Sequence, residues 1–111
     1  MSRSRAHRVG VNEALFREVN EKIEDLNQAF GAVAGTMAIV CECGDSSCTE
    51  QVEVDLDLYE RVRSDPALFV VVTGHDAPDV EETVERHDGF QVVRKRDGEP
   101  HRVAEKTDPR A

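Results

Sequence analysis

The sequence has no tryptophan, one tyrosine and four phenylalanines, so a hydrophobic core must be built mainly from aliphatic side chains. At 111 residues the chain suits one small domain, near the size at which a core alone gives modest stability. No apolar run approaches the ~18 residues that cross a bilayer. No apolar segment follows the basic N-terminus, as it would in a secretory signal. We therefore expect a cytosolic protein without membrane association.

Cysteine is scarce and confined to one place. Cys41, Cys43 and Cys48 lie within eight residues, and the rest of the sequence has no cysteine. Thiols on one tight loop are poorly spaced for a relaxed disulfide framework, and an odd number leaves one over. A cytosolic compartment also keeps thiols reduced. Three thiols around a Gly-Asp-Ser-Ser turn therefore indicate metal ligation.

Basic residues are outnumbered, with 14 against 23 acidic residues and a formal charge of −9. The first ten residues nevertheless contain Arg3, Arg5 and Arg8 and no acid, so the remainder is more acidic still. A domain this acidic is poorly suited to binding nucleic acid, because the phosphates are bound by Lys and Arg. We expect a disordered basic tail over residues 1–11. An arm that binds RNA or another acidic partner through residues 1–10 is the alternative.

An amphipathic helix is predicted over residues 12–30. Its apolar side chains recur at alternating spacings of three and four, as in an a/d stripe formed by Phe16, Val19, Ile23, Leu26 and Phe30. Charged residues, among them Glu13, Arg17 and Glu24, fall on the other face. The first interpretation is that the stripe packs on the protein's own sheet. The alternative is that it binds a partner or a second copy of the chain.

The rest of the pattern indicates short strands and one short helix. In chain order we predict strands at 37–40 and 50–54, a helix at 56–64, a strand at 68–72 and a hairpin at 80–86 and 90–93. The first two strands flank the cysteine loop and form a zinc-knuckle hairpin. The predicted fold is a single α+β domain over residues 12–95, with a long N-terminal helix and a small, mostly antiparallel sheet. Residues 96–111 are expected to be a flexible tail.

Zinc prefers four soft or borderline donors in a tetrahedral arrangement. The glycine-containing turn can fold Cys48 back toward Cys41 and Cys43. His75, at the end of the most apolar predicted strand, is the favoured fourth donor, because a strand end beside the core would fix its position. The alternatives are His7, His87, His101 and an acid such as Asp45. The sequence thus predicts a structural Zn²⁺ held by three thiolates and one imidazole.

Other chemistries compete for the same thiols. A redox-active cysteine needs a low pKa, whereas Glu42 and Asp45 beside the thiols would raise it. An iron–sulfur cluster usually takes four cysteines. A catalytic zinc keeps one position open, and the sequence has no HExxH, deaminase, phosphate-loop or nucleophile-elbow motif. A structural site is therefore favoured over catalysis, a redox site, a cluster or copper.

Four segments carry motifs: FREVNE at residues 16–21, VCECG at 40–44, VVVTGH at 70–75, and ERHDG at 85–89 followed by VVRK. Together they resemble a set of small actinobacterial proteins of unassigned function, over most of residues 12–95. In that set a CECG-x3-C segment and a downstream Gly-His recur together, so the resemblance implies a Cys3His site. It implies no activity and no partner.

The predicted function is a small zinc-binding, non-enzymatic binding or adaptor module. Its candidate partner-binding residues are Phe16, Val19, Ile23 and Leu26, and the partner is another protein or a second copy bound through helix 12–30. One alternative is a redox- or metal-responsive regulator whose thiols release zinc on oxidation. Another is a nucleic-acid-associated protein that uses the basic N-terminal arm.

Overall fold

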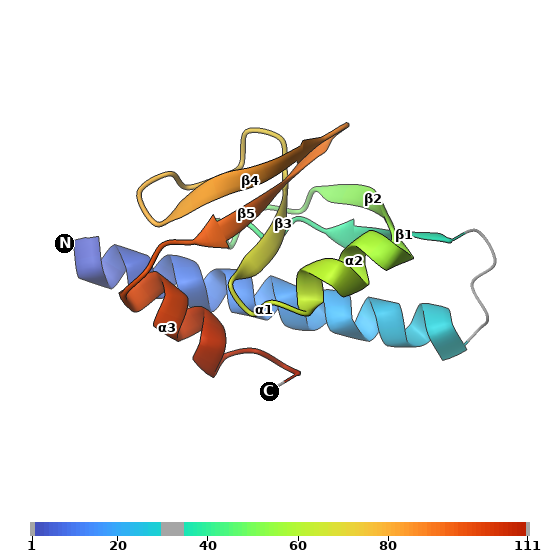
Figure 1. The fold of residues 1–111 in the computed structure, drawn as a ribbon, viewed down its shortest axis with the longest axis horizontal. Coiled ribbons are helices and arrows are strands. Elements are labelled where there is room, and N and C mark those ends of the chain that lie inside the picture. The colour runs from blue at the N-terminus through green and yellow to red at the C-terminus, as the bar shows by residue number, and fades with distance from the viewer. Residues whose placement is uncertain (1, 30–34, 111) are drawn as a thin grey trace.

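The computed structural model describes residues 2–29 and 35–110, and it has an α+β architecture (Figure 1). The described residues form three helices: α1 (Ser2–Ala29), α2 (Leu56–Arg63) and α3 (Glu99–Lys106). They also form five strands: β1 (Thr36–Val40), β2 (Gln51–Asp55), β3 (Leu68–Val72), β4 (Glu81–His87) and β5 (Phe90–Lys95). The predicted fold class, with its long N-terminal helix and antiparallel strands, is confirmed.

The strands form two small antiparallel sheets. One pairs β1 with β2, and the other has the order β3-β5-β4. The predicted strands, the hairpin around the cysteine loop and the β4–β5 hairpin are all confirmed, each to within a few residues. Beyond the end of β1, the N–H of Glu42 donates to the carbonyl of Val70 in β3 (2.8 Å). This bond joins the two sheets beside the cysteine loop.

Among the described residues, three clusters of buried side chains fill the interior, and the smallest of them, of Ala6, Val9 and Val80, lies beside α1. The largest cluster lies between the two-stranded sheet, α2 and the three-stranded sheet, and contains Met37, Ile39, Val54, Tyr59, Val62, Val70, Phe90 and Val92. The second contains Cys41, Cys43, Phe69, Val71, Val93 and Ala104. Two of the cysteines are therefore part of the core boundary, not of an exposed loop.

Helix α1 runs below both sheets (Figure 1), and much of the face that it buries is polar. The buried residues on this face include Ala6, Val9, Glu13, Arg17, Asn20 and Glu24. Arg17 shows how a charge is accommodated there: its guanidinium donates to the carbonyls of Pro66 (2.7 Å) and Ala104 (2.9 Å) and lies 4.4 Å from the centre of the Phe69 ring. Buried polar groups are tolerated when they are bonded in this way.

The predicted apolar stripe is divided by this orientation of α1. Phe16 and Ile23 are half-buried, and Ile23 packs against the largest core cluster. Val19 and Leu26 are 39% and 58% exposed. The interpretation that the whole stripe packs on the protein's own sheet is therefore wrong, because the neighbouring polar face has partners inside the fold. Phe30 lies outside the described residues.

The disordered tail predicted for residues 1–11 is wrong for residues 2–11, which form the first turns of α1. Ala6 and Val9 lie on the same face as the buried residues further along the helix, and they pack with Val80. Contact with this remote residue stabilises a segment whose own sequence is polar. Among the described residues, no helix combines the length and the apolar character that a membrane span requires.

The flexible tail predicted for residues 96–111 is also wrong over the length of α3. Val103 and Ala104 are buried, and α3 packs across α1 (Figure 1). A Cβ on Gly10 of α1 would come within 2.7 Å of a Val103 methyl carbon. The glycine therefore permits the close approach of the two helices.

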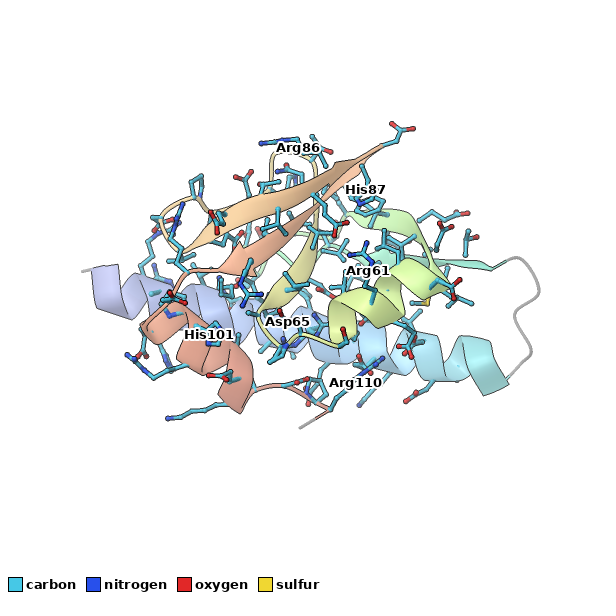
Figure 2. All side chains as sticks on the ribbon, viewed as in Figure 1. Arg61, Asp65, Arg86, His87, His101 and Arg110 are labelled. Carbon is cyan, nitrogen blue, oxygen red and sulfur yellow. The ribbon has the colours of Figure 1, made fainter. Side chains whose placement is uncertain are left out.

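After α3, Arg110 forms ion pairs with residues of α1 and α2 (Figure 2). Its guanidinium donates to the carboxylates of Glu21 (3.0 Å), Glu24 (2.7 Å) and Glu60 (2.5 Å). The side chain of Glu24 is only 3% exposed. Burial, together with the neighbouring Glu60, raises the pKa of Glu24 to about 7.

We expect Glu24 to make the free energy of unfolding depend on pH between 4.5, its ordinary pKa, and about 7. The folded state binds this proton more tightly than the unfolded state, so stability should fall as pH rises through that window. Glu24→Gln should reduce the slope, whereas Asp25→Asn, at an exposed position of the same helix, should not. Urea unfolding at several pH values measures how the free energy of unfolding of each variant changes with pH. Equal slopes in the two variants would contradict the prediction.

Candidate metal centre

The three cysteines lie on and beside the tight loop between β1 and β2. The N–H of Cys41, directly after β1, donates to the carbonyl of Glu50 (2.9 Å) and closes the base of the loop. The N–H of Cys48 donates to the carbonyl of Asp45 (3.0 Å), which folds the third thiol back. The Asp45 carboxylate accepts the N–H (2.9 Å) and hydroxyl (2.6 Å) of Ser47. The backbone thus holds the predicted knuckle closed.

Gly44 lets this loop lie directly on α1. A Cβ at position 44 would come within 2.5 Å of a methyl carbon of Val9. The side-chain amide of Asn12 also donates to the Gly44 carbonyl (2.9 Å). A larger residue at position 44 would push the loop away from the helix, and with it the thiols.

His75 reaches the thiols from the turn after β3. Gly74 has a φ of 87°, a left-handed conformation that favours glycine, and the N–H of His75 then donates to the carbonyl of Val72 (2.9 Å). This turn places Nδ1 of the imidazole 3.6 Å from Sγ of Cys41 and 3.7 Å from Sγ of Cys48. The predicted proximity of His75 to the cysteines is confirmed.

The four predicted ligand atoms converge on one point. The three Sγ atoms and a ring nitrogen of His75 all lie within 4.8 Å of one another. A tetrahedral zinc with bonds of about 2.3 Å to sulfur and about 2.0–2.1 Å to nitrogen would separate those two donors by about 3.6 Å. The observed sulfur–nitrogen distances of 3.6 and 3.7 Å agree with that value. The cluster can therefore hold a metal ion.

The alternative donors have other partners. His7 pairs with Glu99, His87 with Glu85, and His101 with Glu105. Figure 2 shows His87 at the end of the β4–β5 hairpin and His101 on α3. The Asp45 carboxylate bonds to Ser47 instead. In the part of the chain that the structure describes, His75 is the histidine that joins the three cysteines.

The second ring nitrogen of His75 has a partner that the sequence pattern did not indicate. Its Nε2 lies 2.9 Å from a carboxylate oxygen of Glu50. A carboxylate in this position holds the proton on Nε2 and leaves the Nδ1 lone pair free, as outer partners of metal-bound histidines do. Glu50 is distant from His75 along the chain, so the contact exists only because the knuckle lies against the turn after β3.

Glu42 is a second residue whose role the sequence did not reveal. It lies between two cysteines, yet it is fully buried and directed away from them, as expected for the middle residue of an extended segment. Its carboxylate accepts the N–H of Val70 (2.9 Å) and the side-chain amide of Asn20 (2.7 Å). Asn20 in turn bonds the N–H and carbonyl of Val40 (2.8 Å each). This network anchors the base of the knuckle to α1 and β3.

The burial of the thiols affects both redox chemistry and metal ligation, because each needs the thiolate form. Burial raises the pKa of Cys41 and of Cys43. A reactive cysteine needs the opposite, a lowered pKa and access to solvent. A bound cation favours the thiolate form and releases the protons. The N–H of Val72, 3.2 Å from Sγ of Cys41, is already placed to stabilise negative charge on that sulfur.

Comparison with known proteins does not identify a family for this chain. No family model matches the sequence, and no curated protein and no solved structure matches the chain. The resemblance to small actinobacterial proteins therefore stays a prediction. The interpretation of the site depends on the geometry of the four donors.

A cleft of about 400 Å³ borders the cluster on one side. Its walls are Arg5 and Val9 of α1, Gly44 and Asp45 of the knuckle, and residues 74–78. Cys43 and His75 also line it, so the donor cluster lies at the edge of the interior.

Proposed function

We propose that this chain is a small zinc protein in which Cys41, Cys43, Cys48 and His75 hold a structural Zn²⁺. The convergence of their donor atoms within 4.8 Å of one another carries the proposal. Three thiolates with one neutral imidazole are a donor set typical of structural zinc. Four protein donors complete the tetrahedron, so the ion has no free position for a substrate. A non-enzymatic binding or adaptor role follows from this closed site.

The ion would crosslink a loop of one sheet to the turn that follows a strand of the other sheet. The cysteines belong to the loop of the two-stranded sheet, whereas His75 follows β3 of the other sheet. For a small domain with an aliphatic core, the free energy of binding such an ion contributes directly to folding. The site would thereby hold the knuckle and α1 in one arrangement.

The two alternative functions receive less support. Zinc release on oxidation needs a sulfur that an oxidant can reach, and Cys41 and Cys43 are only 1% and 3% exposed. A nucleic-acid arm needs free basic residues, but residues 2–11 are helical and Arg5 is paired with Asp79 (2.7 Å). We therefore infer a cytosolic module that binds another protein, since the reducing cytosol keeps such thiols available for zinc.

The ligand assignment predicts one zinc ion per chain, measured by elemental analysis and native mass spectrometry. His75→Ala should lower zinc affinity by more than about 100-fold, and Glu50→Gln by about 10–100-fold, as expected for an outer partner. His87→Ala is the matched control, because this histidine also pairs with a carboxylate but lies outside the cluster.

Competition with a chromophoric chelator measures these affinities. If His75→Ala binds zinc as tightly as His87→Ala, the fourth donor lies elsewhere. A wild-type protein that is fully folded without metal would contradict the structural role of zinc.

A further inference from the structure

We propose that a second copy of this chain binds along the outward face of α1, forming an antiparallel homodimer. This face consists of Val11, Leu15, Val19 and Leu26, which we call the outer apolar face. It is separate from the metal centre and does not depend on the assignment of zinc.

The outer apolar face concentrates the exposed hydrophobic surface of the molecule. Val11, Leu15, Val19 and Leu26 are 45%, 56%, 39% and 58% exposed. They are four of the five large apolar side chains that are exposed among the described residues, and the fifth, Val84, lies on β4. Single exposed apolar residues are ordinary, but a row of them marks an interaction surface.

The outer apolar face opens into a groove. A hollow of about 430 Å³ is bounded by Val11, Ala14 and Leu15 on α1 and by residues 106–109 on the other side. Such a hollow can receive an apolar side chain from another helix. From residue 11 to residue 26 the face extends about 22 Å along the helix axis, or about four turns. That length suits contact with a second straight helix.

The charged residues on the outer apolar face indicate that it binds α1 of a second copy and that the two helices run antiparallel. The exposed Glu18 and Lys22 lie between the apolar residues. With a two-fold axis near residue 20, an antiparallel copy sets Lys22 opposite Glu18 of the second copy and brings Leu15 close to its Leu26. A parallel copy would instead oppose Glu18 to Glu18 and Lys22 to Lys22. The face is therefore complementary to itself in the antiparallel direction, as a two-fold interface requires.

The first test is the mass of the full-length, zinc-loaded chain in solution, by sedimentation equilibrium over a range of concentrations. We expect a reversible dimer of twice the 12.4 kDa chain mass. Leu15→Asp and Leu26→Asp should each raise the dimer Kd by more than about tenfold, because both copies change at once. Val84→Asp is the matched control and should leave Kd unchanged. Leu15→Ala and Leu26→Ala give the same comparison if an aspartate variant fails to fold, as judged by circular dichroism.

The second test concerns direction. Glu18→Lys and Lys22→Glu should each weaken the dimer, and the double exchange should restore it, because the pairs between antiparallel copies are then re-formed. In a parallel dimer Glu18 faces Glu18 and Lys22 faces Lys22, so each single variant only replaces one like-charge contact with another and should leave the dimer Kd close to the wild-type value. A monomeric wild type at all concentrations, or a dimer that Leu15→Asp and Leu26→Asp leave intact, would overturn the proposal.

Discussion

Cys43→Ser should unfold the domain or lower its melting temperature by more than about 15 °C. The side chain is buried, and its Sγ is one of four donors that lie within 4.8 Å of one another. Structural zinc binds small domains with an apparent free energy of about 10–16 kcal/mol. The stability of a whole domain is only about 5–15 kcal/mol. Loss of the proposed zinc ion would therefore remove a free energy comparable to the stability of the whole domain.

The measurement is thermal unfolding followed by circular dichroism, with zinc content recorded for each protein. Ser46→Ala is the matched control, because it changes an exposed residue of the same loop that is not a proposed ligand. A strong chelator added to the wild type should reproduce the effect of Cys43→Ser. If the chelated wild type melts at the temperature of the zinc-loaded protein, the thiol cluster has no structural role in folding.

Lys95→Ala should be the most destabilising change away from the metal centre, by about 3–5 kcal/mol. The Nζ of Lys95 bonds Glu13 (2.5 Å) and Glu81 (2.9 Å), and all three side chains are 0% exposed. Removing the ammonium group leaves two buried carboxyl groups facing each other without their cation. The shortened side chain also leaves a cavity beneath α1.

The buried triad of Lys95, Glu13 and Glu81 predicts that Glu13→Gln lowers the free energy of unfolding less than Lys95→Ala does. Burial, followed by the negative charge of Glu81, raises the pKa of Glu13 well above its ordinary value. Glutamine resembles the protonated acid, so it preserves the form that this environment favours. Urea unfolding measures both variants, with the exposed Lys106→Ala as the control. Equal midpoints for Lys95→Ala and Lys106→Ala would show that the triad contributes no net stability.

The two sides of α1 would make different contacts, one with the metal centre and the other with a second copy of the chain. On the inner side, Val9, Asn12 and Asn20 contact the knuckle and the end of β1. The outer side carries the apolar residues proposed to meet a second copy. Zinc would then hold the knuckle against a helix whose other face makes the intermolecular contact. Loss of zinc should consequently weaken the dimer, and by linkage loss of the dimer should weaken zinc binding by the same factor.

Local patterns are sufficient to predict the strands and the four residues whose donor atoms converge. Period-two alternation and β-branched runs located β1, β2 and β3, and these elements need little information from elsewhere in the chain. The cysteines are close together in sequence, so their convergence required only a turn. His75 was identified because it follows a buried strand, and the end of such a strand lies beside the core.

Helix α1 shows where local patterns failed. Its apolar and polar residues both recur with the period of a helix, so the sequence predicted the helix but not the face that it buries. Glu13 and Arg17 are buried because of Lys95 and Ala104, which lie 82 and 87 residues away along the chain. No local window contains both partners of such a contact. The same reason explains why the sequence alone predicts tails where α3 and the first turns of α1 form.

By itself the sequence determined the α+β class, the hairpin that carries the thiols and the chemistry of the four donors. These depend on residue type and on short-range spacing, which the chain specifies directly. Only the tertiary structure decided which side of α1 faces inward, that Glu50 supports His75 and that Glu42 anchors the knuckle. A buried charge is stable only beside its partner, and that partner comes from a distant segment, so such choices are made when the elements pack together.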